Sequence, residues 1–329
     1  MIRIFRHTQY DFIKWWRTAA IATAAFIIVG LGATLLRGGL RRSIDFTGGT
    51  LMQLTFTQPP DVGQLRAALD AGGVRDAEIT QFGSNREFTV RAQNEDATGG
   101  AATQGAAAVA RRVQNVLTQR FGAGAFQVVR TEAVGPRVGS ELSRGALYAI
   151  LASFVLTLVY LWFRFEWRFG LAAVIATAHD IFTTVAFIGL MHIEVSLTVI
   201  AAILTVIGYS LNDTIIIFDR VRENLRKHRG MPLYDVVNLS VNETLPRSVL
   251  THATTLGATL ALLFFAGEVI RPFAWVMAFG IFTGTFSSIY VASAILIWIE
   301  RRYPRPVADA RRAPAARPAA RAERTLAAS

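Results

Sequence analysis

The chain has 329 residues, of which 52% are hydrophobic and 17% charged, and its 34 Lys and Arg against 23 Asp and Glu give a net charge of +11. A nucleic-acid-binding protein would carry such a charge on a polar, Lys- and Arg-rich surface, whereas this chain contains long uncharged stretches. The composition favours a polytopic membrane protein over a soluble domain, and with no Cys it excludes disulfides, cysteine-ligated zinc and thiol chemistry.

Six segments are apolar over the length of about 20 residues that a helix needs to cross a bilayer. They are residues 18–36, 143–163, 169–190, 195–218, 248–267 and 272–299. The first could instead be a signal peptide, since basic residues precede it, but its apolar run is longer than such a peptide needs. The sequence therefore predicts a polytopic α-helical membrane protein with six transmembrane helices, one at 18–36 and five within 143–300.

The polar region between the first two spans, residues 37–142, has the pattern of an α+β domain. Apolar alternation or helical spacing predicts a strand at 52–57, a helix at 61–71, strands at 78–82 and 87–92, a helix at 106–121 and a strand at 126–131. The order βαββαβ predicts one ferredoxin-like domain between helices 1 and 2. Residues 94–105 are expected to be a loop, and residues 301–329 a disordered basic tail.

The charge distribution predicts the orientation in the membrane. If residues 1–17 and the tail are both cytoplasmic, the segments on that side hold 20 of the 34 Lys and Arg but only 9 of the 23 Asp and Glu. Such an excess is typical of cytoplasmic loops. Both termini are therefore expected in the cytoplasm, with the α+β domain on the periplasmic, extracytoplasmic side.

The run Asp45-Phe46-Thr47-Gly48-Gly49 resembles a phosphate-binding loop only superficially, because no helix beginning with Lys follows it. We interpret it as a tight turn or bulge that enters a strand. The outer domain shows neither a Ser/His/Asp set nor paired carboxylates for catalysis. An enzyme, a cofactor and a metal site are therefore not expected.

Asp213 is a carboxylate inside the fourth predicted span, where charge is costly and usually functional. Small and polar residues share one face of this span, namely Ala201, Thr205, Gly208 and Asn212. The fifth span has a matching polar face made of Arg247, Ser248, Thr251, Thr254 and Thr255. An ion pair between Asp213 and Arg247 would lower the cost of burying both charges, and it could act either as a proton site or as a static clamp.

His179 and Asp180 lie in the middle of the third span and form a second candidate site. They could relay protons or simply join helices by hydrogen bonds. His252 is expected to hydrogen-bond across helices without titrating. Gly280 and Gly284 form a small-residue face that predicts close helix packing.

Four motifs together resemble the SecF branch of the SecD/SecF family, which belongs to the resistance-nodulation-division superfamily. They are Ile44 to Thr50 after the first span, Ala178-His179-Asp180, Gly208 to Asn224, and Asn242-Glu243-Thr244-Leu245-Pro246-Arg247-Ser248. The resemblance covers residues from about 10 to 300. It implies that Asp213 and Arg247 lie on the ion pathway, and that Asp45 to Gly49 is a structural motif where the outer domain meets the membrane. Asn212, Asp180 and His179 are further candidate residues of the proton pathway.

The same resemblance implies a protein-translocation subunit of the bacterial cytoplasmic (inner) membrane. Its partners would be SecD, the SecYEG channel, the translocating preprotein and the lipid bilayer, with YajC as a further candidate and no nucleic acid. The proton motive force, or sodium in some bacteria, would drive late export steps. Two rival functions remain open: half of a proton-coupled small-molecule exporter, and a scaffold that transports nothing.

Overall fold

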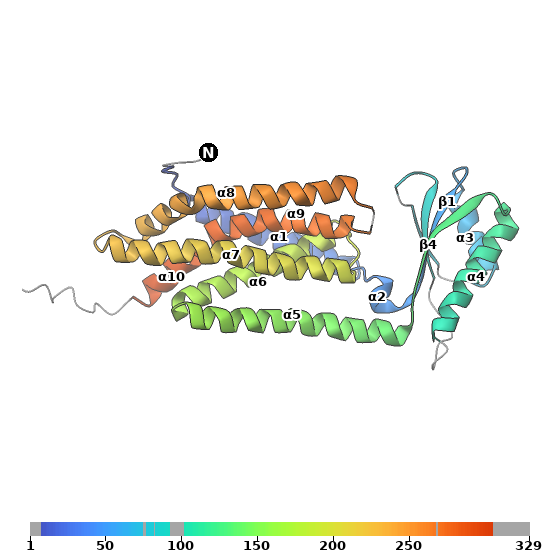
Figure 1. Ribbon diagram of the computed structural model, residues 1–329, viewed down its shortest axis with the longest axis horizontal. Coiled ribbons are helices and arrows are strands. Elements are labelled where there is room, and N and C mark those ends of the chain that lie inside the picture. The colour runs from blue at the N-terminus through green and yellow to red at the C-terminus, as the bar shows by residue number, and fades with distance from the viewer. Residues whose placement is uncertain (1–7, 75–76, 82, 93–101, 268, 305–329) are drawn as a thin grey trace, which may run out of the picture.

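The computed structural model describes residues 8–74, 77–81, 83–92, 102–267 and 269–304, and shows a long helical bundle with an α/β domain at one end (Figure 1). Six helical segments within these residues are long and apolar enough to cross a membrane. They are Ile13–Leu36, Arg137–Arg164, Trp167–Leu190, Leu197–Lys227, Leu233–Phe265 and Arg271–Arg302. The prediction of six membrane-length helices is confirmed.

The bundle is built around α7. Its helices are α1 (Trp16–Leu36, after the short turn η1, Ile13–Trp15), α5 (Pro136–Arg164), α6 (Trp167–Leu190), α7 (Leu197–Lys227), α8 (Leu233–Phe265), α9 (Arg271–Phe286) and α10 (Ser293–Arg302). A π-helical segment, η2 (Ser287–Ala292), joins α9 to α10. α7 packs against α6, α8 and α9, whereas α5 runs along one side of the bundle (Figure 1).

Glycines let the central helices approach closely. A Cβ atom placed on Gly280 of α9 would lie 2.2 Å from Cγ2 of Val206 on α7, and one on Gly284 would lie 3.0 Å from Cβ of Ser210. The small-residue face expected at Gly280 and Gly284 therefore packs as predicted. α6 meets α1 in the same way, because a Cβ on Gly189 would lie 1.8 Å from Oγ1 of Thr34.

Several helices are longer than the predicted spans. α7 continues to Lys227 and α8 begins at Leu233, so the region 219–247 between the fourth and fifth predicted spans is mostly helical. Ion pairs from Glu223 to Arg220 and to Lys227, three and four residues away, stabilise the polar end of α7. The apolar pattern ends near residue 218, whereas the helix continues to Lys227.

The outer domain contains β1 (Gly49–Phe56), α3 (Val62–Ala71), β2 (Glu78–Gln81), β3 (Glu87–Ala92), α4 (Ala102–Phe121) and β4 (Phe126–Val134), the six elements expected in the expected order. The strands form an antiparallel sheet in the order β2-β3-β1-β4, with Met52 opposite Val90 on β3 and Thr131 on β4. Residues 102–105 of the predicted loop begin α4, and the rest of that loop, like most of the predicted tail, lies outside the described residues.

One face of this sheet is covered by α3 and α4 and forms an apolar core. Leu54, Leu65, Phe88 and Leu117 are each at most 2% exposed there. The alternation of apolar and polar residues along β1 produces this arrangement, since successive strand residues point to opposite faces. The other face is polar and lines a cavity of about 490 Å³ shared with the outer end of the bundle.

Candidate functional site

Asp213 is buried in the bundle at the contact of α7 with α8, with 2% of the residue exposed. The hydroxyl of Ser248 on α8 donates a hydrogen bond to its Oδ1 atom, at 2.5 Å. Its Oδ2 atom is also buried, and no described residue forms a hydrogen bond with it. Half of this carboxylate is therefore left without a polar partner in the part of the chain that the structure describes.

His252 lies one turn further along α8, and its ring packs against that of Tyr209 with centroids 5.2 Å apart. Its Nδ1 atom is 2.5 Å from the carbonyl oxygen of Ser248 on the same helix, so the cross-helix hydrogen bond expected for His252 is not found. Tyr209 makes the cross-helix contact instead, because its hydroxyl donates to the carbonyl oxygen of Thr251 at 2.9 Å.

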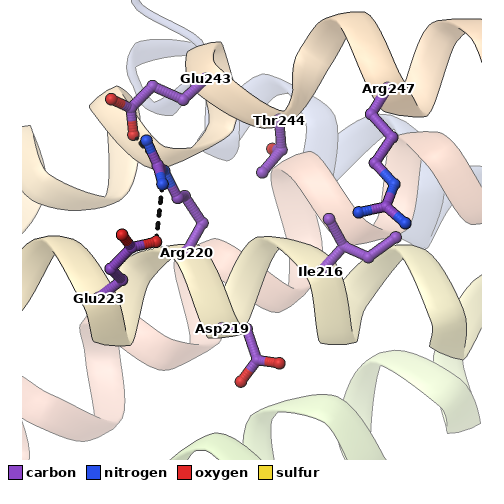
Figure 2. A pocket seen from close by; sticks show the side chains of 7 residues that line it. All are labelled: Ile216, Asp219, Arg220, Glu223, Glu243, Thr244 and Arg247. Carbon is purple, nitrogen blue, oxygen red and sulfur yellow. Dashed lines mark hydrogen bonds and ion pairs between the residues drawn. The ribbon is translucent and has the colours of Figure 1, made fainter.

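Arg247 does not pair with Asp213 in this structure, which corrects the predicted ion pair. Its side chain extends toward Ile216 of α7 and lines a pocket of about 470 Å³ (Figure 2). The physical reason is helical geometry: Ser248 faces Asp213, and the preceding residue projects about 100° away around a helix of 3.6 residues per turn.

The pocket beside Arg247 is rich in carboxylates. Arg220 donates to Glu243 at 2.6 Å and to Glu223 at 2.7 Å, as Figure 2 shows for the second contact. Asp219, on the same pocket, pairs with Arg164 of α5. Arg247 therefore lines an acidic pocket at the polar end of α7, whose three carboxylates pair with Arg220 or Arg164.

The other predicted site residues are distributed over the bundle. Asn212 is exposed on the outside of α7 and does not join Asp213. Asp180 of α6 is 1% exposed and accepts a hydrogen bond from Ser210, which precedes Asp213 on α7 by three residues. His179 and Asp180 of α6 therefore form a second polar site, which is joined to the central helix α7 through Ser210.

The motif from Asp45 to Gly49 forms the short helix α2 (Ile44–Thr47) and a turn that leads into β1. Gly48 and Gly49 have φ values of 73° and 126°, which L side chains rarely adopt. Oδ2 of Asp45 accepts a hydrogen bond from the backbone N–H of Leu197, the first residue of α7, at 3.0 Å. The motif therefore adds to the cap of the helix that carries Asp213, whose N-cap residue is Ser196.

Sequence reasoning did not find this cap, because 152 residues separate its partners. Nor did it find that Arg91 of β3 forms ion pairs with Glu78 of β2 and with Glu194 in the turn before α7. Burial lowers the pKa of Arg91 below its ordinary value, while Glu78 opposes that shift. A periodic pattern carries no signal for either contact.

We expect Asp45→Ala to destabilise the protein by about 1 kcal/mol, the usual cost of losing a helix cap. Thermal unfolding of the purified protein in detergent measures this effect. Asp45→Asn is the matched control, because it keeps an acceptor oxygen and should unfold close to the wild-type temperature. An Asp45→Ala protein as stable as the wild type would contradict the capping role.

Among the described residues, no three His, Asp or Glu side chains cluster as a metal site would require. A bundle of six membrane-length helices with an α/β domain beyond one end, and with buried carboxylates on α6 and α7, defines a polytopic membrane protein.

Comparison with known proteins gives the family. Residues 113–302 match the family model described as "Protein export membrane protein SecD/SecF, C-terminal", and residues 35–60 match "SecD/SecF GG Motif". The protein translocase subunit SecF of Gemmatimonas aurantiaca is 60% identical over 93% of this chain and 91% of its own length. SecF of Escherichia coli O157:H7 is 39% identical over 88% of this chain and 87% of its own.

The structure is also similar to solved SecDF structures. The crystal structure of SecDF from Thermus thermophilus, a translocon-associated membrane protein, matches with a TM-score of 0.79 and 36% identity over 92% of this chain and 40% of the longer SecDF chain. A SecDF structure in a super-membrane-facing form matches with a TM-score of 0.64. This chain belongs to the SecF branch of the SecD/SecF family, and it is a multi-pass inner-membrane protein.

Proposed function

We propose that this chain works with SecD and uses the proton motive force to drive late steps of protein export through SecYEG. SecD would supply the part of the SecDF chain that this chain does not match. Both termini would lie in the cytoplasm and the α/β domain, with its ferredoxin-like strand order, in the periplasm. Contact with SecYEG, YajC and the preprotein is part of the same proposal.

The buried carboxylate of Asp213 is the observation that supports this proposal. An ionised carboxylate in a membrane interior is expensive unless a cation or several hydrogen bonds compensate it. Here a single hydroxyl, that of Ser248, contacts one of its two oxygens. Adding a proton to Oδ2 would remove the charge without disturbing that contact, so this geometry suits a proton-loaded carboxylate.

Arg247 would supply the alternative state of the site. When Asp213 loses its proton, the long guanidinium side chain can swing from the acidic pocket to the carboxylate, because Arg247 is adjacent to Ser248 on α8. Pro246, inside α8, removes one backbone hydrogen bond immediately before Arg247, which favours local bending there. Each proton transferred would then move α7 against α8.

Movement of α7 would reach the outer domain through the cap at Asp45. The backbone also joins the two parts, because the N–H of Ser43 donates to the carbonyl oxygen of Val195 at 2.8 Å and the N–H of Val195 donates to that of Arg41 at 2.8 Å. One of the matched SecDF structures is described as a super-membrane-facing form, which supports a family that adopts more than one form.

The decisive experiment is ion current through liposomes that contain SecD with this chain, measured against pH and against sodium. We expect a proton-dependent current in the wild type and none in Asp213→Asn. Asp70→Asn, an exposed carboxylate of α3, is the matched control and should conduct normally. Normal current and export by Asp213→Asn would overturn the proposal, and a current that follows sodium alone would replace the proton with sodium.

A further inference from the structure

A hydrogen-bonded chain of polar groups crosses the bundle at His179 and Asp180, away from the site at Asp213. Oγ1 of Thr23 on α1 lies 2.7 Å from Nε2 of His179, and Nδ1 of the same ring lies 3.0 Å from Oδ1 of Asp180. Ser210 of α7 donates to the other oxygen, Oδ2. Three helices, α1, α6 and α7, are thus joined through one histidine and one carboxylate.

The contacts of the imidazole ring fix where a proton can be exchanged. With Asp180 ionised, Nδ1 carries hydrogen and donates to it. Nε2 can then accept from the hydroxyl of Thr23 when the ring is neutral, or donate to the same oxygen when the ring is protonated, since a hydroxyl can do either. His179 can therefore gain or lose a proton at Nε2 without losing a hydrogen bond.

The surroundings make this change in charge consequential. The Asp180 side chain is 1% exposed, and its described neighbours on other elements are the hydroxyls of Ser210 on α7 and Ser287 on η2. No Lys or Arg among the described residues forms an ion pair with it, so His179 is its one source of positive charge there. The side chain of His179 is 12% exposed, so the ring is less enclosed than the carboxylate of Asp180.

The carboxylate is connected to the helix that carries Asp213. Ser210 lies one helical turn before Asp213. Thr214 is the residue after Asp213, and its Oγ1 atom lies 2.8 Å from the hydroxyl oxygen of Ser288 in the π-helical segment η2. π-helical turns within membrane-length helices are rare and frequently occur at functional sites. A change of charge at His179 therefore acts on both α7 and η2 at the level of Asp213.

We propose that His179 is a second proton-exchange site, that Asp180 positions it, and that Ser210 transmits its charge state to α7, so that pH controls how readily Asp213 cycles. This inference rests on the proposed function of Asp213. This role differs from a purely structural hydrogen bond between helices, because a structural bond does not require the His179 ring to change its charge.

The test uses the complex of SecD with this chain in liposomes and lipid nanodiscs. Ion current is compared at pH 6 and pH 8, values that bracket the general range of histidine titration. We expect His179→Gln to conduct but to change the ratio of the two currents by about threefold or more. Thr23→Val, which removes only the hydroxyl, should change the ratio in the same direction, and His228→Gln, an exposed histidine after α7, should leave it unchanged.

Nitrogen NMR of the labelled histidines provides a readout that does not depend on transport. In the wild type, the neutral His179 ring should carry its hydrogen on Nδ1 and should gain a second proton at Nε2 as the pH falls. Asp180→Leu, or Asp180→Asn if the first variant does not fold, should change the signal of His179 and leave that of His228 as it was.

The outcomes separate this inference from the proposed function. If Asp213→Asn abolishes the current while the current ratio of His179→Gln equals that of the wild type, the inference is wrong and the proposed function stands. If the His179 ring keeps one charge state from pH 5 to pH 8, the inference is also wrong. A normal current in Asp213→Asn would overturn the function of Asp213 itself.

Discussion

Replacing Asp213 by Leu and Arg247 by Met in one protein is expected to reduce proton-dependent current and export to background while assembly with SecD persists. The two side chains do not pair with each other in this structure, so under the proposed function their removal takes away the proton site and its switch and breaks no contact between them. Copurification with SecD measures whether assembly persists, and ion current measures whether proton transport is lost.

The same double variant distinguishes a subunit that couples proton flow to export from one that only supports the channel complex. A buried pair that only fastens helices can often be replaced by apolar side chains of similar volume without loss. If the variant exports normally, the chain acts as a scaffold of the channel complex. If it no longer copurifies with SecD, Ser248→Ala offers a milder change, because it removes only the hydrogen bond to Asp213.

Gly280→Leu should disrupt the packing of α9 against α7. A Cβ atom there would lie 2.2 Å and 2.7 Å from the two γ-carbons of Val206, and the branched valine has few alternative rotamers. Overpacking of this kind typically costs about 1–3 kcal/mol, more than the gain from removing a helical glycine.

Thermal unfolding of the purified chain in detergent measures this loss. Gly145→Leu is the matched control, because nothing lies within 4 Å of a Cβ atom at that position of α5. It should unfold at or slightly above the wild-type temperature. Equal unfolding temperatures for the two variants would show that α7 and α9 are not packed as the structure has them.

Much of the fold is predictable because two simple periods govern it. Runs of about 20 apolar residues located all six membrane-length helices, and the alternation in β1 together with the helical spacing in α3 located the outer domain. The helix ends were predicted less well. The membrane no longer selects apolar residues beyond its surface, so ion pairs such as Arg220–Glu223 extend α7 without any hydropathy signal.

The candidate site was predicted by residue type more successfully than by pairing. A carboxylate in an apolar span is conspicuous, and Asp180 and Asp213 are both buried as expected for intramembrane charges. Which side chain meets Asp213 depends on the rotation of α8 about its axis, and a rotation of one residue exchanges Arg247 for Ser248. The local sequence pattern does not determine the rotation of α8 about its axis. It also gives no signal for long-range contacts such as that of Asp45 with Leu197.

The capped, unbroken helix α7 has a mechanical consequence. Its 31 residues, at 1.5 Å each, make a rod about 46 Å long that is fastened at its outer end to Asp45. A tilt of about 5° around that fastening would displace the opposite end of α7 by about 4 Å, with Asp213 roughly halfway along. With this contact as the fixed point, a small displacement of α7 at Asp213 would rotate the helix about Asp45 and so turn it against the outer domain.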